Sequence, residues 1–324
     1  MFTAFVRLAD NNTKQLESMD ALADAWAQDD ATVWVDLEEP TPDELSRLGR
    51  VVGANEAALE DCLHGEQHPR IDEYEDHIFM VLYGAIGPEP NARFDPRKLA
   101  VFCGKRFLAT VHREPVRTIR TLRERCNRHP TQVLANGVDA LLHHIIDMMV
   151  DNFVDMADNY ETRLEELEER SLSQAVDESI LEDMMDLRRE ILGLRRVAAA
   201  QRELLTPLAE GEFDYVSERL GQHFSHVRDH LIKVVELIDA QRERLAGVRD
   251  NYHTALAVRT NGVMKTLTGF AAVLLPISVV AGIYGMNLRV WPSPGHPWGF
   301  WIVLAAMAAM GGGFLLYFKR RGWL

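Results

Sequence analysis

The sequence predicts an α+β fold in three parts: an N-terminal α/β domain, long stalk helices and a C-terminal hairpin of two membrane-spanning helices. Three observations predict it. Strand-like segments and tight turns are confined to the first part of the chain, segments with apolar residues three and four positions apart follow, and two long uncharged apolar runs lie at the end. We expect an α/β domain at residues 1–130, an antiparallel helical hairpin at 131–213, a stalk helix at 214–265, a first span at 266–288, a loop at 289–297, a second span at 298–318 and a basic tail at 319–324.

The N-terminal part carries clear local signals. Thr32–Leu37 (TVWVDL) alternates as a strand does, and His77–Ile86 is apolar enough for a buried strand. Between them, Thr41, Pro42 and Glu44 have the spacing of an N-cap, a first helical residue and the third residue of a capping box. The stretch KLAVFCGKRFLATVHR predicts two strands that turn at Gly104-Lys105.

The middle of the chain predicts helices. Apolar residues from Ile146 to Leu167 recur in steps of three and four, which predicts one apolar stripe with an acidic opposite face. Ser173–Ser179 interrupts this helix, and we expect the next helix to end at Pro207 and Gly211. From about Asp214 no convincing stop occurs before Asn287, so a single helix would continue from the stalk into the first span.

The C-terminal runs predict a membrane hairpin. Thr266–Leu288 and Trp298–Phe318 contain no charged residue, and all 49 acidic residues of the chain lie before residue 260. Each run is long enough to cross a hydrocarbon core of ~30 Å, although a buried soluble hairpin is the alternative. Basic residues flank both runs on the same side, which places both termini and the acidic body in the cytoplasm and the hairpin in a bacterial-type inner (cytoplasmic) membrane, in contact with lipid.

Composition excludes several functions. The formal net charge of −14 argues against nucleic-acid binding. The sequence contains no glycine-rich phosphate loop, nucleophile elbow or catalytic dyad, so we expect no enzyme.

The first span has a candidate polar path. Two spans cannot enclose a pore, so several copies of the chain would have to surround one. The stripe that would line it is mostly apolar and ends at a neutral amide; its members are Met264, Leu267, Ala271, Leu274 or Leu275, Ser278, Gly282, Gly285 and Asn287. Close packing of helices through small residues predicts the same pattern, so periodicity alone leaves both interpretations open.

The motif GIYGMN, preceded by MKTLTGFAAVLLP and followed by a second span ending in YFKRRGWL, resembles the CorA family of divalent-cation channels. The resemblance covers nearly the whole chain. It implies a homopentamer, with Gly285, Met286 and Asn287 as the outer selectivity site and with Met264, Leu267, Leu275 and Ser278 lining the pore. Members of the family have Met and Thr at the places of Leu275 and Ser278.

The resemblance implies Mg²⁺ as the transported ion, with passage of Co²⁺ or Ni²⁺. Mg²⁺ prefers oxygen ligands and sheds its water reluctantly, so a ring of Asn287 amides can hold the hydrated ion through its waters. The loop after the motif offers Arg289 and His296, where members of the family often carry a Glu. Apolar rings at Leu267 and Met264 would form a gate that closes by dewetting.

The resemblance also implies a regulatory cytoplasmic metal site at subunit interfaces. One partner would be Glu75 or Asp76, and the other would be His226, with Asp229 one turn further on; the family has an acidic residue at the position of His226. An imidazole suits Zn²⁺, Co²⁺ or Ni²⁺ better than Mg²⁺. His223, His226 and His230 share one helical face, which predicts either a metal- or pH-responsive site or a solvated surface.

Two other functions fit parts of the pattern. A zinc transporter of the ZntB type is a close alternative, although the zinc branch usually varies the middle residue of the Gly-Met-Asn motif. A membrane-anchored coiled-coil scaffold that transports nothing belongs to a different class. Measured fluxes of Mg²⁺ and Zn²⁺ distinguish these two functions from a CorA-type channel.

Overall fold

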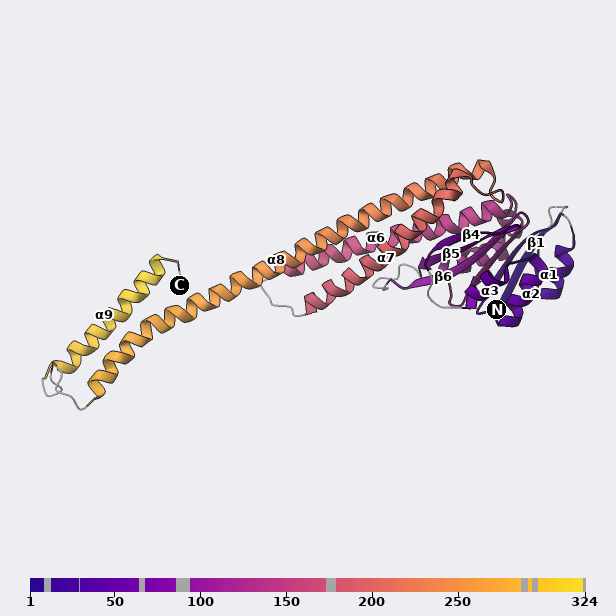
Figure 1. Cartoon of the computed structure of the whole chain (residues 1–324). Helices are drawn as coiled ribbons and strands as arrows, with labels where there is room; N and C mark the ends of the chain where they lie inside the picture. The colour runs from indigo at the N-terminus through magenta and orange to yellow at the C-terminus, as the bar shows by residue number, and fades with distance from the viewer. Residues whose placement is uncertain are drawn as a thin grey trace. The chain divides into compact units, whose positions relative to one another are not determined.

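In the described part of the chain, seven strands form one sheet in the order β2-β1-β3-β7-β6-β5-β4 (Figure 1). The computed structural model describes residues 1–8, 13–28, 30–63, 68–85, 94–172, 179–286, 291–292 and 297–322. The strands are β1 (Phe2–Arg7), β2 (Thr13–Leu16), β3 (Thr32–Glu38), β4 (Arg70–Glu73), β5 (His77–Ala85), β6 (Pro96–Gly104) and β7 (Phe107–His112). All pairs are antiparallel except β3 with β7, which run parallel. The chain divides into an N-terminal unit, Met1–Val248, and a C-terminal unit, Arg249–Leu324.

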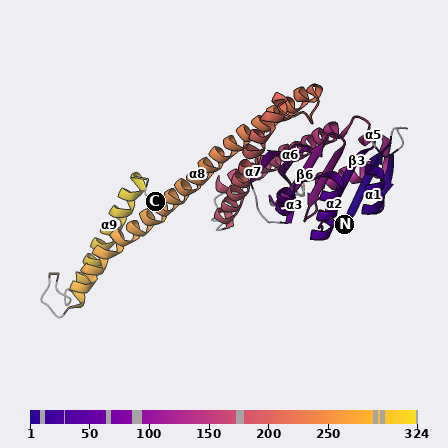
Figure 2. The ribbon, with the colours of Figure 1, turned by 45° about the vertical axis from the view of Figure 1, so that its right-hand side comes forward.

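Helices cover both faces of this sheet. The helices of the N-terminal unit that precede the long ones are α1 (Met19–Trp26), α2 (Pro42–Val52), α3 (Glu56–Leu63), α4 (Arg117–Arg128) and α5 (Pro130–Val133). The α6 helix (Val138–Leu172) contacts β3, β5, β6 and β7 on one face, while α1, α2 and α3 lie over the other (Figure 2). Central strands such as β7 are therefore buried along their whole length, as expected for a sheet covered on both sides.

The local predictions in this unit are confirmed. Thr41 caps α2 through the amide of Glu44, the Glu44 carboxylate accepts from the Thr41 amide in return, and Pro42 is the first helical residue. Strands β6 and β7 pair antiparallel on either side of the predicted turn. Side chains also link the parallel strands β3 and β7: the Thr110 hydroxyl donates to the buried Asp36 carboxylate at 2.7 Å.

Three long helices pack side by side in the N-terminal unit (Figure 1). They are α6, α7 (Ser179–Glu210) and the first part of α8 (Glu218–Gly285). Ion pairs Arg163–Glu190 and Arg170–Asp183 fix the antiparallel register of α6 and α7. The α8 helix contacts both of them: Gln241 of α8 donates to the Ala157 carbonyl of α6 at 2.8 Å, and Arg195 of α7 donates to Asp239 of α8 at 2.7 Å.

One predicted helix end is wrong. Pro207 lies inside α7, which continues to Glu210. The buried residues Leu204, Leu205 and Leu208 keep this last turn packed, and that packing offsets the loss of one amide donor. Gly211 ends the helix as predicted, with a φ of 71° in the left-handed region.

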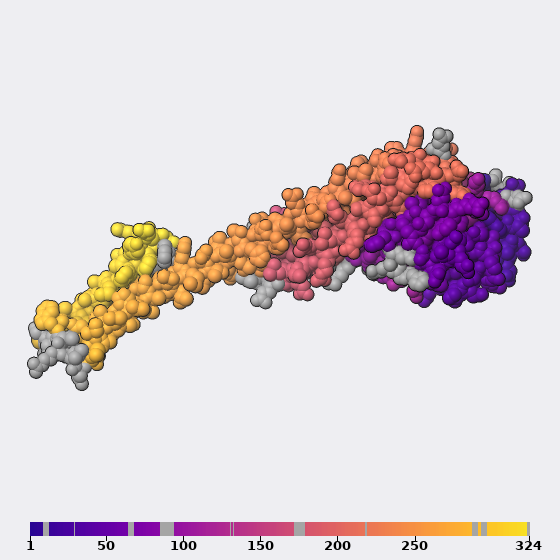
Figure 3. Space-filling view, viewed as in Figure 1, coloured from indigo at the N-terminus to yellow at the C-terminus, as the bar shows by residue number. Residues whose placement is uncertain are grey.

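The C-terminal unit consists of the second part of α8 and of α9 (Gly299–Arg320), each long and apolar enough to cross a membrane. Little of either apolar segment is buried within the chain. In the space-filling view, α9 is the yellow helix whose first turns lie against the end of α8 (Figure 3).

Candidate functional site

The packing of α9 divides the last part of α8 into two faces. Gly311 of α9 approaches Ile277 and Val273 of α8 so closely that an added Cβ would lie 3.2 Å from Ile277 Cδ1. Residues on this side of α8 are half-buried, among them Val273, Pro276, Ile277, Val280 and Tyr284. This face of α8 is therefore the one that holds the two apolar helices together.

The predicted pore stripe lies on the other face of α8. Met264, Leu267 and Leu275 are 54%, 61% and 65% exposed, and Ser278 is exposed as well. A continuous row of exposed apolar side chains on a single chain needs a covering surface, which another copy of the chain or lipid can supply. The stripe is thus separate from the contact with α9. Helix packing was the alternative interpretation of the periodicity, and within this chain α9 does not pack on the stripe.

The Gly-Met-Asn motif begins where α8 ends. Gly285 is the last residue of the helix, and the Met286 amide donates to the Ile283 carbonyl at 3.2 Å. From the residue before Gly285, the Tyr284 hydroxyl donates to the Trp291 carbonyl across the connection, at 2.8 Å. Asn287, Arg289 and His296 lie outside the described residues.

The predicted regulatory residues lie on separate elements. Glu75 and Asp76 are exposed in the turn between β4 and β5, where the Tyr215 hydroxyl donates to the Tyr74 and Glu75 carbonyls. His226 and Asp229 are exposed on α8. Within the described part of a single chain, no hydrogen bond or ion pair joins the two pairs.

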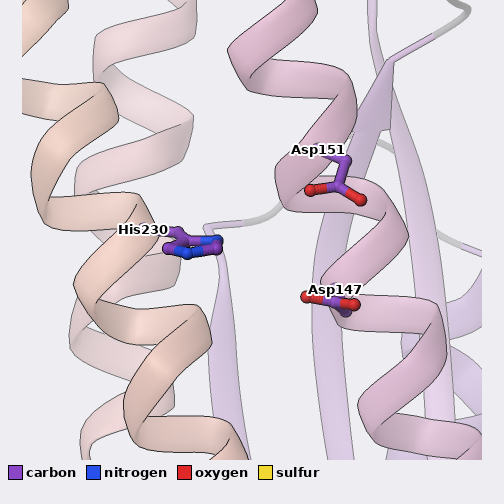
Figure 4. Close-up of side chains that lie close together, drawn as sticks. All are labelled: Asp147, Asp151 and His230. Atoms are coloured by element: carbon purple, nitrogen blue, oxygen red, sulfur yellow. The ribbon is translucent and has the colours of Figure 1, made fainter.

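His230 has carboxylate neighbours that sequence reasoning missed. Ligand atoms of Asp147, Asp151 and His230 all lie within 4.8 Å of one another, and Figure 4 shows the two carboxylates of α6 beside the His230 ring of α8. Burial raises the pKa of Asp151, and the neighbouring Asp147 charge raises it further. Two like charges with an imidazole facing them form a donor set that suits a divalent cation.

The three histidines of the shared face do not converge. His230 joins the carboxylates, whereas the His223 ring packs edge-on against His143 of α6 with a centroid distance of 5.4 Å. The signal for the carboxylates was present in the sequence, because Asp147 and Asp151 are four residues apart and share a helical face. Their contact with His230 depends on the register of α6 against α8.

Comparison with known proteins decides the family. The model of the CorA-like Mg²⁺ transporter protein family matches residues 29–320. The chain belongs to the CorA-like Mg²⁺ transporter family. Membership confirms the resemblance drawn from the motif, the expectation of a non-enzymatic transporter and the assignment of two C-terminal membrane spans.

Relatives within the CorA-like family match along most of their length. YfjQ of Bacillus subtilis is 31% identical over 91% of this chain and 91% of its own. The cobalt/magnesium transport protein CorA of Thermotoga maritima is 27% identical over 87% of this chain and 80% of its own. The complete structure of the CorA magnesium transporter of Methanocaldococcus jannaschii has a TM-score of 0.85 at 23% identity and covers 99% of this chain and 98% of that one, which confirms the fold.

Proposed function

We propose that several copies of this chain form a membrane channel for divalent cations, chiefly hydrated Mg²⁺, with passage of Co²⁺ and Ni²⁺. The observation that carries the proposal is the uncovered stripe of α8, Met264 to Gly285, which leads to the Gly-Met-Asn motif. The Thermotoga maritima relative is named as a cobalt/magnesium transport protein, which supports the same ions.

The stripe has to face a partner or a water-filled path. The α9 helix covers only the opposite face, so one chain cannot surround an ion. Copies arranged about an axis would place Leu267, Leu275 and Ser278 of each chain around a common path. The family resemblance implies five copies, with both termini in the cytoplasm of a bacterial-type cell.

Selection at the motif would act on the hydrated ion. Asn287 offers an amide oxygen without a charge, and the Gly285 carbonyl belongs to the last turn of α8. Such dipoles accept hydrogen bonds from the inner-shell waters of Mg²⁺, and the ion keeps its water on entry. Because these contacts are weaker than those to carboxylates, the ion also leaves quickly. The membrane potential supplies about 4.6 kcal/mol per 100 mV for a +2 ion.

Cytoplasmic metal would close the channel by binding Asp147, Asp151 and His230. Mg²⁺ fits the two carboxylates, whereas the imidazole adds affinity for Co²⁺, Ni²⁺ or Zn²⁺. A bound ion would join α6 to α8, and α8 continues from this site into the first membrane span. Glu75, Asp76, His226 and Asp229 remain candidates for a second site that needs a neighbouring copy.

Flux in proteoliposomes tests the channel. Wild-type protein should pass Mg²⁺, Co²⁺ and Ni²⁺, and Asn287→Ala should reduce Mg²⁺ flux by more than tenfold, because the ring loses every side-chain acceptor (an effect of the order of 1.4 kcal/mol or more). Flux of Zn²⁺ without Mg²⁺ would identify a zinc transporter instead. Absence of any flux, with no effect of Asn287→Ala, would indicate a scaffold.

Regulation has its own test. Asp147→Asn with Asp151→Asn should leave flux intact at low internal metal but weaken its closure by internal Co²⁺. The control is Asp158→Asn, an exposed α6 position outside the cluster. If internal Co²⁺ closes the double variant as readily as wild type, the cluster is not the regulatory site. The proposed channel function would be unaffected by that result.

A further inference from the structure

A group of basic side chains gathers around a cavity in the N-terminal unit. The cavity has a volume of about 520 Å³ and lies where α4, α5, α6 and the first turns of α8 meet. Arg125, His143, His144, Arg219 and His223 line it, and none of its described lining residues carries a carboxylate. In a chain with a net charge of −14, this local composition is unusual. The volume lies within the range of small-molecule sites, roughly 300–1,000 Å³.

Helical geometry explains why these side chains share one space. Arg219 and His223 are four residues apart at the start of α8 and therefore lie on one face. His143 and His144 lie in the early turns of α6, and Arg125 lies near the end of α4. The edge-on contact between the His143 and His223 rings holds the two helices together at the cavity.

The fixed positive charge of the cavity comes from the two arginines. Burial lowers the pKa of His143 and of His144, and the Arg125 charge lowers that of His144 further, so both rings are mainly neutral at pH 7. Arg125 Nη1 lies 3.1 Å from His144 Nε2, and because a guanidinium only donates, Nε2 accepts and the proton resides on Nδ1. This hydrogen bond restrains the Arg125 side chain at the cavity.

Neither arginine is neutralised by a carboxylate within the described residues. The nearby Asp139 is already engaged, since its oxygens accept from the Ser217 amide at 3.2 Å and from the Ala140 amide at 2.8 Å. By contrast, the neighbouring Arg128 on α4 forms an ion pair with Glu124. Arg125 and Arg219 therefore have donors left for a ligand.

We propose that this cavity binds an anion through phosphate groups. Guanidinium forks match the oxygens of a phosphate and bind it through paired hydrogen bonds. Neutral imidazole N–H groups, the Asn136 amide and the Ser217 hydroxyl supply further donors at the same cavity. The cavity exceeds the size of one phosphate, so it accommodates pyrophosphate or the phosphate groups of a nucleotide. None of Asp147, Asp151 and His230 is among the described residues that line the cavity. The two sites are neighbours on α6, because the Asp147 and Asp151 charges raise the pKa of His144 against its larger lowering by burial. No metal is needed for binding at the cavity.

Calorimetric titration of the full-length protein in detergent tests the proposal. Sodium phosphate, sodium pyrophosphate and ATP are titrated in the presence of EDTA, so that no metal chelate contributes. Arg125→Gln and Arg219→Gln should each raise the Kd of the anion that binds by about tenfold, the loss expected for a charge-assisted pair. The matched controls Arg128→Gln and Arg242→Gln remove the same charge from α4 and α8 outside the cavity and should change the Kd less than twofold.

Each outcome decides the proposal. Equal Kd values for pyrophosphate and ATP would show that the phosphate groups alone are recognised. A lower Kd for ATP that still depends on both arginines would identify a nucleotide as the ligand. The proposal is overturned if none of the three anions binds wild-type protein at millimolar concentration, if binding requires Mg²⁺, or if the control variants weaken it equally. Thermal unfolding gives a second measurement: the anion should raise the Tm of wild-type protein and of both controls, but not that of the Arg125→Gln/Arg219→Gln double variant.

Discussion

Gly311 of α9 lies against Ile277 of α8, and the space between them does not admit a larger side chain without movement of its neighbour. An added Cβ would stand 3.2 Å from Ile277 Cδ1 and 3.8 Å from Val273 Cγ1. Helices in membranes commonly approach each other through such small residues, because no hydrophobic effect drives them together inside lipid. This contact leaves the opposite face of α8 free for other surfaces.

Gly311→Leu should separate the two helices. The larger side chain overpacks the contact, and we expect a loss of about 1–3 kcal/mol in stability together with reduced ion flux. Gly312→Leu is the matched control, since a Cβ at Gly312 meets nothing within 4 Å. Thermal unfolding in detergent measures the difference. An equal effect of both variants would contradict a specific role for Gly311.

Introduced cysteines should distinguish the two faces of α8. Leu275→Cys and Ser278→Cys should react rapidly with a charged thiol reagent that enters the water-filled path, whereas Val273→Cys and Ile277→Cys on the α9 side should react slowly. The native thiols will not interfere, because burial raises the pKa of Cys62, Cys103 and Cys126 to about 12 each. Rates are measured by mass shift in reconstituted protein. Equal reaction rates at all four positions would contradict the assignment of the stripe as the pore lining.

The ion pair between Arg163 and Glu190 should stabilise the α6–α7 pair. Its two hydrogen bonds measure 2.8 and 3.1 Å, and the Glu190 side chain is only 7% exposed. Arg163→Met leaves this carboxylate buried without its cation and should cost about 3 kcal/mol. The surface pair of Arg128 and Glu124 is the comparison, where Arg128→Met should cost less than about 1 kcal/mol. Chemical denaturation of the full chain measures both, and equal costs would contradict the prediction.

Protonation of Asp151 should stabilise the fold in the absence of metal. Its pKa is raised in the folded state, so the folded chain binds this proton more readily than the unfolded chain does. The penalty on the ionised carboxylate is present above the folded pKa and is relieved as the pH falls through it. Asp151→Asn should therefore raise the Tm at neutral pH in EDTA, and the gain should shrink as the pH falls toward the ordinary value of about 3.9.

Bound metal should reverse the sign of the Tm change that Asp151→Asn produces. With Co²⁺ present, wild-type protein gains stability from binding, and Asp151→Asn should gain less. Asp158→Asn, an exposed position on the same helix, should follow wild type with and without metal. If Co²⁺ stabilises Asp151→Asn as much as wild type, the cluster does not hold the ion.

Local physical chemistry made much of this fold predictable. The capping box of Thr41 and Glu44 needs only four consecutive residues, and the strands on either side of Gly104-Lys105 need only a turn. The two apolar C-terminal helices follow from length and absence of charge, because the hydrocarbon core imposes both. The Gly-Met-Asn motif pointed to the family for a similar reason, since its position after an apolar run is a property of the sequence itself.

Tertiary structure alone decided what depends on packing. The parallel pairing of β3 with β7 joins segments separated by more than one helix and several strands, and no local pattern specifies it. Pro207 remains in α7 because buried leucines hold the last turn. His230 meets Asp147 and Asp151 only because α6 and α8 pack in one register, and a shift by one turn would separate them. The basic cavity has the same origin, since Arg125 and Arg219 come from helices that only the folded chain brings together.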